Sequence, residues 1–183
     1  MKYLKYLLFF IVILVLIFFG NGLLNPSITY ENEVVVNKSV AESWAVMEDE
    51  SRISEWLHVI DRLELVSGEA STVGAVSNIY VIENGEEMVM QETITASIPQ
   101  AYMAMTFTMD FMNMDYELFM TEKDGKTHIR SKTTTLGNGI FSQSMISFLN
   151  GMMCDQEAEN LNNLKKVIEQ NQKNYFLNKS LAI

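Results

Sequence analysis

The sequence predicts an α+β domain in which a curved antiparallel sheet of about seven strands wraps around one long C-terminal helix. Three observations predict it. Apolar and polar residues alternate over 59–136, which is typical of strands. Asn84-Gly85 and Asp124-Gly125 are two-residue hairpin signals, so neighbouring strands run antiparallel. The stretch 141–172 then has apolar residues at helical spacing and no proline, and it is the candidate to cover the apolar face of the sheet.

One strand and two short helices precede the alternating region. The strand is expected at 28–37, followed by a capping box, Ser39-Val-Ala-Glu42, in which Ser39 caps a free amide and Glu42 reaches back. This box opens a helix through Met47, and a second helical turn is expected around 52–56. Further strands are expected at about 59–67, 72–83, 87–97, 101–109, 112–122 and 126–136.

The long helix has two apolar faces. The spacing places the first set on one face and the second set on another, with the change just after Gly151, which indicates a bend. The first set is Phe141, Met145, Phe148, Leu149 and Met152. The second is Leu161, Leu164 and Ile168.

Residues 3–24 are apolar enough to span a bilayer. A cleaved signal peptide is the alternative, but no Ala-x-Ala-like site follows, which favours an uncleaved anchor. Lys2 and Lys5 precede the segment and no basic residue follows until Lys38, so we expect a single-pass protein with a cytoplasmic N-terminus and an extracytoplasmic domain. The expected division is an anchor at 1–25, a domain at 26–172 and a tail at 173–183.

The charge and the cysteine content exclude several functions. The net charge of −10, with no basic run, argues against a nucleic-acid partner. The single cysteine, Cys154, excludes an internal disulfide and a cysteine-based zinc site, and it is expected to be a small buried hydrophobe. Two distant histidines, His58 and His128, do not form a metal-site pattern. No cofactor is expected.

A series of short sequence pieces between about residues 30 and 170 occurs in a recognisable order. The pieces are Val40 to Trp44, Asp49, Trp56, Gly68, Val73-Gly74, Gln91-Glu92-Thr93-Ile94, Pro99, Asp124-Gly125-Lys126-Thr127 and Asn163-Leu164-Lys165. Together they resemble the START-like (SRPBCC) superfamily, which includes polyketide cyclase/dehydrase, aromatase-like and lipid-transfer proteins. The resemblance implies a helix-grip fold with a deep apolar cavity between sheet and long helix. It fixes no reaction, since that superfamily contains enzymes, carriers and sensors, and the N-terminal anchor is not part of its pattern.

If this cavity exists, the pleat of each strand predicts which side chains face it. Eleven of the thirteen methionines lie between Met88 and Met153, where they either fill the core or line a surface for apolar ligands. Glu92 falls on the same inward face, as a polar group for a ligand, as a general acid, or as the partner of Arg130 or Lys132. The candidate ligand-binding residues are Trp56, Met88, Met90, Glu92, Met103, Met105, Phe107, Met114, Tyr116, Leu118, Met145, Leu149 and Met152.

Two residues near the expected mouth have ordinary alternatives. Trp56 either gates the cavity or packs, and His58 is either an acid or base or a solvated loop residue. The sequence has no nucleophile elbow, phosphate-binding glycine loop or dinucleotide fingerprint, so no catalytic set is assigned.

The function expected is a membrane-anchored binding or carrier domain for a small hydrophobic ligand such as a lipid, an isoprenoid or a quinone-like compound. Glu92 and Tyr116 would orient the ligand. An acid/base enzyme of the cyclase or dehydratase type, using Glu92 with Tyr116 or His58, is the alternative. A structural module with a filled core is the third.

Overall fold

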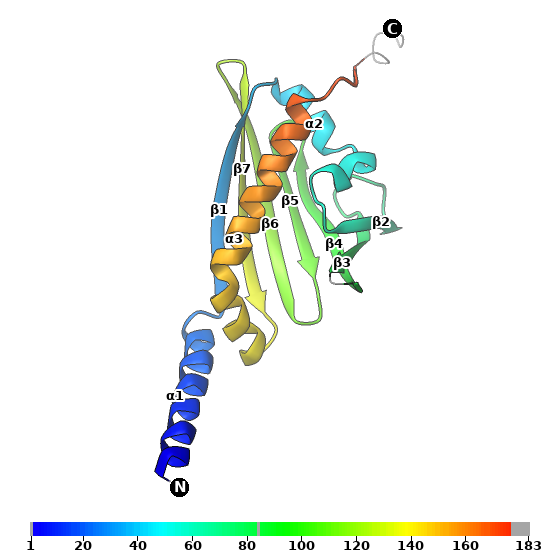
Figure 1. Ribbon diagram of the computed structural model, residues 1–183. Helices are drawn as coiled ribbons and strands as arrows, with labels where there is room; N and C mark the ends of the chain where they lie inside the picture. The colour runs from blue at the N-terminus through cyan, green and yellow to red at the C-terminus, as the bar shows by residue number, and fades with distance from the viewer. Residues whose placement is uncertain (1, 84, 177–183) are drawn as a thin grey trace.

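Seven antiparallel strands form one curved sheet, with strand order β1-β7-β6-β5-β4-β3-β2. The computed structural model describes residues 2–83 and 85–176 (Figure 1). Each strand lies within a few residues of its expected position, although β3 begins four residues later than expected, after the turns at 68–75. The strands are β1 (Ser27–Val36), β2 (Ile60–Ser67), β3 (Val76–Glu83), β4 (Glu86–Ile98), β5 (Tyr102–Thr108), β6 (Met112–Lys123) and β7 (Lys126–Gly137).

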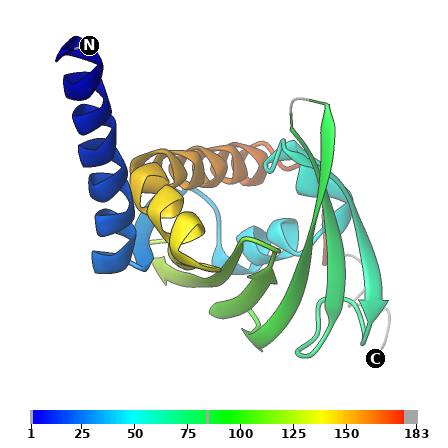
Figure 2. The same cartoon turned by 90° about the horizontal axis from the view of Figure 1, so that it is seen from below.

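Three helices and one 3-10 helix accompany the sheet: α1 (Lys2–Leu24), α2 (Val40–Met47), η1 (Glu50–Glu55) and α3 (Ile140–Glu169). α3 crosses the concave face of the sheet, and α1 projects from one end of the domain (Figures 1 and 2). The predicted α+β fold is confirmed. β1 pairs with β7 although they are far apart in sequence, so the first strand completes the sheet beside the last.

Local turn chemistry explains the hairpins. Asp124 and Gly125 both have positive φ, 53° and 71°, as a two-residue type I′ turn requires, and they join β6 to β7. Gly85 also has positive φ (84°) between β3 and β4. Its predicted turn partner, Asn84, lies outside the described residues.

At the start of α2, Ser39 caps the helix as expected, but Glu42 does not reach back to the backbone. The hydroxyl of Ser39 accepts a hydrogen bond from the amide of Glu42 at 3.3 Å. The Glu42 carboxylate instead binds Lys38 Nζ at 2.7 Å. An available ammonium outcompetes the backbone amide for this carboxylate.

α3 is one continuous helix, and Figure 2 shows that its first turns (yellow) run in a different direction from the remainder (orange). Its later face packs on the sheet as predicted, because Leu161, Leu164 and Ile168 are almost fully buried. Its earlier face does not. Phe141 and Phe148 are each more than half exposed to solvent.

The earlier face of α3 contacts α1. Phe18 lies 5.6 Å from Phe148 in a stacked arrangement and 5.7 Å from Phe141, measured between ring centroids. Asn21 Nδ2 donates to Ser147 Oγ at 2.8 Å. Helical spacing identified an apolar face correctly but could not indicate which element that face would meet.

Candidate ligand-binding cavity

A cavity of about 250 Å³ lies between the sheet, η1 and α3. Its wall is mainly apolar, with methionine, isoleucine and leucine side chains from the middle strands and aromatic rings at several points. The lining residues are Tyr30, Met47, Glu48, Glu50, Ile53, Trp56, Leu57, Val59, Ile60, Leu63, Ser71, Ile79, Met90, Glu92, Ile94, Met103, Met105, Phe107, Met114, Tyr116, Leu118, Thr133, Glu157 and Asn160.

Strand register builds a polar group at one side of this cavity. Tyr30 of β1 and Tyr116 of β6 both pair with Thr133 of β7, so the three side chains stand next to one another on one face. Glu157 of α3 lies opposite, and the Tyr116 hydroxyl donates to its Oε1 at 2.9 Å. This group therefore depends on three strands and one helix.

Burial changes the acidity of these groups. It raises the pKa of Tyr30 to about 12 and that of Tyr116 well above its ordinary value, with the nearby Glu157 charge as a further cause. It also raises the pKa of Glu157. Both tyrosines are therefore hydrogen-bonding groups at neutral pH and not bases.

Glu92 stands on β4, where it pairs with Phe107 of β5. Burial raises its pKa to about 7, with the charge of Glu50 as the second cause. The ion pair with Arg130 or Lys132 considered from the sequence does not form, because Arg130 pairs with Glu31 and Lys132 with Glu117 across the sheet. Within residues 2–83 and 85–176 Glu92 has no ion-pair or hydrogen-bond partner.

The structure brings nine of the thirteen candidate residues to the cavity wall: Trp56, Met90, Glu92, Met103, Met105, Phe107, Met114, Tyr116 and Leu118. Met88, Met145, Leu149 and Met152 are not part of the wall. Met88 is 41 % exposed near the start of β4, and Met152 is 62 % exposed on α3. Roles in ligand binding stay predictions for all thirteen.

Sequence reasoning missed Tyr30 and three glutamates, Glu48, Glu50 and Glu157, on the wall. The alternation in β1 did place Tyr30 with Val34 on one face, which was the available signal. Glu157 sits in a run of polar residues, Asp155 to Asn160, where helical spacing gave no reason to single it out.

The remaining candidates lie away from the cavity wall. His58 Nδ1 is 3.2 Å from the carbonyl oxygen of Ser54 at an exposed site, and His128 Nδ1 is 2.9 Å from Glu33. Cys154, expected to be buried, is half-buried near Asn32. Among the described parts of the chain, no three His, Cys, Asp or Glu side chains gather in a way that would hold a metal ion.

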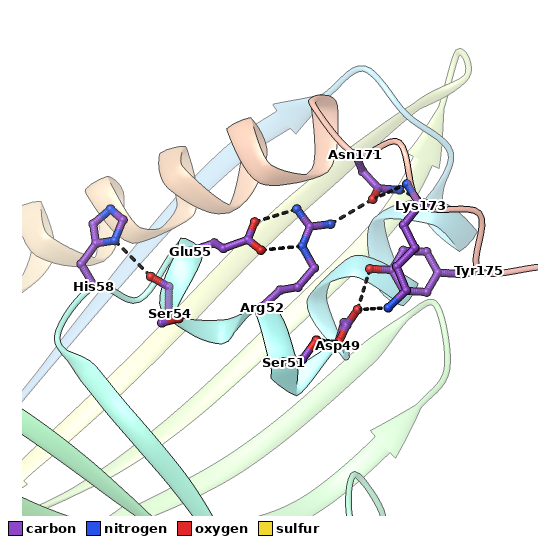
Figure 3. A network of polar contacts seen from close by, with 9 residues as sticks. All are labelled: Asp49, Ser51, Arg52, Ser54, Glu55, His58, Asn171, Lys173 and Tyr175. Carbon is purple, nitrogen blue, oxygen red and sulfur yellow. Dashed lines mark hydrogen bonds and ion pairs between the residues drawn. The ribbon is translucent and has the colours of Figure 1, made fainter.

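The segment after α3 folds back onto η1. Lys173 Nζ and the Tyr175 hydroxyl both bind Asp49 Oδ2, at 2.7 and 2.8 Å (Figure 3). Arg52 donates to Asn171 Oδ1 at 2.9 Å. Because Glu50 and Ile53 of η1 line the cavity, these bonds hold one wall of it in place.

Solved structures similar to this chain include aromatase/cyclases and other proteins. The chain is 14 % identical to the Zhui aromatase/cyclase from Streptomyces sp. R1128, with a TM-score of 0.66 over 79 % of this chain and 94 % of that one. It is 15 % identical to Ara h 8.0201, with a TM-score of 0.63 over 79 % and 99 %. These likenesses confirm the helix-grip fold that the START-like resemblance implied.

A third similar structure is StfQ, a di-domain aromatase/cyclase from the steffimycin biosynthetic pathway. It is 11 % identical, with a TM-score of 0.65 over 80 % of this chain and 52 % of that one. No family model and no curated protein matches the sequence. At these identities the comparisons show the fold alone.

Proposed function

We propose that the chain is a membrane-anchored binding or carrier protein for a small hydrophobic ligand. The observation that carries this proposal is the apolar cavity between the sheet and α3, with separate polar groups at Glu92 and at Tyr116–Glu157. Apolar walls with a few fixed polar groups are typical of small-molecule sites. Burial of ligand surface supplies about 25 cal/mol per Å², and the polar groups set the orientation.

The size of the cavity limits the ligand. Its volume of about 250 Å³ is slightly below the range of roughly 300–1,000 Å³ for drug-sized ligands. A single short chain or a small ring system fits this space better than a two-chain phospholipid. By size alone, a short isoprenoid or the ring of a quinone-like compound therefore suits it best among the classes expected from the sequence.

Features of α1 and of the end of the domain beside it support the anchor. The Tyr3–Leu24 segment of α1 has a mean hydropathy of 2.9, and its large apolar side chains from Tyr3 to Ile17 are mostly exposed. Its last turns lie beside α3, where Phe141 and Phe148 are also exposed. From Thr133 to Cys154 the sequence has no charged residue, so this end of the domain suits a lipid surface. Lys2 and Lys5 before the apolar segment, with no further basic residue until Lys38, support a cytoplasmic N-terminus in this proposal.

An acid/base enzyme is the second candidate, and the pKa of Glu92 favours it. A carboxyl with a pKa of about 7 can donate or accept a proton near neutral pH. Glu92 and Tyr116 lie two strands apart and are offset by two residues along the strands, which separates their Cα atoms by roughly 12 Å at normal strand spacing. A substrate would therefore have to bridge them. Glu92→Gln would abolish turnover while leaving ligand affinity nearly unchanged.

Native mass spectrometry of the full chain, released from polymer-bounded lipid discs, tests the carrier proposal. The wild-type chain should carry a reproducible extra mass that organic extraction removes. Met105→Trp should lose this mass, because Met105 lines the cavity and the larger ring fills it.

Met88→Trp is the matched control, since Met88 is exposed on a neighbouring strand and should keep the extra mass. A bare wild-type chain that also fails to take up added apolar ligands would support a structural module in place of a carrier.

A further inference from the structure

The charged residues on the cavity wall all have the same sign. Glu48, Glu50, Glu92 and Glu157 line it, and no Lys, Arg or His in the described parts of the chain does. A cavity built for a fatty acid or a phosphate would need the opposite sign, because an anion transferred there meets uncompensated negative charge at low dielectric. The wall therefore discriminates among apolar ligands by the charge of their polar group.

The charge of one of these glutamates acts on another that stands on a different element. Glu50 begins η1 and Glu92 stands on β4, and the charge of Glu50 contributes to the raised pKa of Glu92. Ser71 Oγ donates to Glu50 Oε1 at 3.2 Å, which fixes that carboxylate. Glu92 has no such partner in the described chain.

The nearest basic side chain on η1 is already engaged. Arg52 binds both carboxylate oxygens of Glu55, at 2.9 and 2.7 Å, and also contacts Asn171. It is therefore not available to neutralise Glu50 or Glu92. Since no basic side chain of the described chain lies on the wall beside these two carboxylates, a cation that pairs with them would come from a ligand.

From these contacts we propose that the cavity binds apolar amines, with the protonated nitrogen between Glu50 and Glu92 and the apolar body against the methionines of β4, β5 and β6. Carboxylates and phosphates of the same size are excluded by the same glutamates. This inference rests on the proposed ligand-binding function and names its ligand class.

The test uses three ligands with one chain length: octylamine, 1-octanol and octanoate. The full chain is held in aliphatic-polymer discs of neutral lipid, which contain no tryptophan, and binding is followed by the fluorescence of Trp56 on the cavity wall. Trp56→Phe identifies the signal that arises there. At about pH 8 the amine is protonated and glutamates are largely ionised. Octylamine should bind at least about tenfold tighter than octanol, and octanoate should not bind measurably.

Glu92→Gln and Glu50→Gln should each remove most of the preference for octylamine over octanol. Neither variant should lower the affinity for octanol. Glu86→Gln on the same strand and Glu159→Gln on α3 are exposed, remove the same charge, and should leave the preference intact. Equal binding of octanoate and octylamine overturns the amine proposal while the carrier function stands. If none of the three ligands binds while circular dichroism shows an intact fold, both the amine proposal and the carrier function are overturned.

Discussion

The hydroxyl of Tyr116 on β6 donates to Glu157 of α3 at 2.9 Å, inside the cavity wall, and so links the sheet to the helix that covers it. The same pair of side-chain types also occurs on the outside of the sheet. There the Tyr102 hydroxyl donates to Glu117 at 2.8 Å. The two pairs have nearly equal geometry and differ in burial, so they provide a matched comparison.

Tyr116→Phe should lower the free energy of unfolding by about 1–3 kcal/mol, because it leaves the buried Glu157 without its donor. Tyr102→Phe should cost clearly less, since water and Lys132 can still serve Glu117. Chemical denaturation of the two variants measures the difference. If both variants lose the same free energy of unfolding, the Glu157 carboxylate must accept a hydrogen bond from another donor in Tyr116→Phe.

Glu92 should make the protein less stable as the pH rises. Its folded pKa of about 7 is above its ordinary value of 4.5, so the folded state holds the proton more tightly than the unfolded state. This contribution is full below about pH 4.5 and is lost as the pH rises through about 7. The change is on the order of 3 kcal/mol, since each pKa unit corresponds to about 1.4 kcal/mol. Glu92→Gln should remove it from thermal unfolding curves.

Glu86→Gln on the exposed start of β4 should leave that pH dependence in place. The charge of Glu50 on η1 contributes to the raised pKa of Glu92. The pH dependence of stability should therefore also be measured for Glu50→Gln. An unchanged pH profile in Glu92→Gln would show that Glu92 is solvated in the folded state.

Asp49 should have the opposite pH dependence. Hydrogen bonds from Lys173 above all, and from Ser51, hold its pKa well below its usual range. Its contribution to stability is therefore present above about pH 4 and is lost as the pH falls through the lower folded pKa. Asp49→Asn should reproduce the acid state at neutral pH, with faster amide exchange at 171–176 measured by hydrogen–deuterium exchange.

Asp61→Asn is the control for Asp49→Asn, because Asp61 is exposed, forms an ion pair with Arg62 away from 171–176, and carries the same charge. Protection of 171–176 should not change in this variant. If amide exchange at 171–176 stays slow in Asp49→Asn, the hydrogen bond between Arg52 and Asn171 holds this segment in place instead.

Gly22 should be required for the contact between α1 and α3. A Cβ at Gly22 would lie 2.2 Å from Ser144 Oγ and 2.6 Å from its backbone nitrogen, whereas a Cβ at Gly20 meets nothing within 4 Å. Gly22→Leu should therefore separate the helices, and Gly20→Leu should not. Oxidative cross-linking of Asn21→Cys with Ser147→Cys, in a Cys154→Ser background, reports the separation. Equal cross-linking in both leucine variants would contradict this packing.

Strand alternation and turn chemistry were sufficient to predict the sheet, because both act over a few residues. The inward face of β5 and β6, from Met103 to Leu118, followed directly from the pleat. Glu157 could not be found in this way, since its neighbours on β1 and β6 are far away in sequence. Helical spacing places Phe148 on an apolar face of α3, but it does not distinguish one apolar partner from another, so the contact with α1 could not be predicted.

The contact of Phe18 with Phe141 and Phe148, together with a link of only Asn25 and Pro26 between α1 and β1, affects how cargo would be exchanged. With α1 in a bilayer, the cavity keeps a constant height and tilt above the lipid instead of sweeping the volume that a long tether allows. Donor and acceptor then meet the cavity by lateral diffusion, as an encounter in two dimensions. The exchange rate would follow the surface density of the partners and not their bulk concentration.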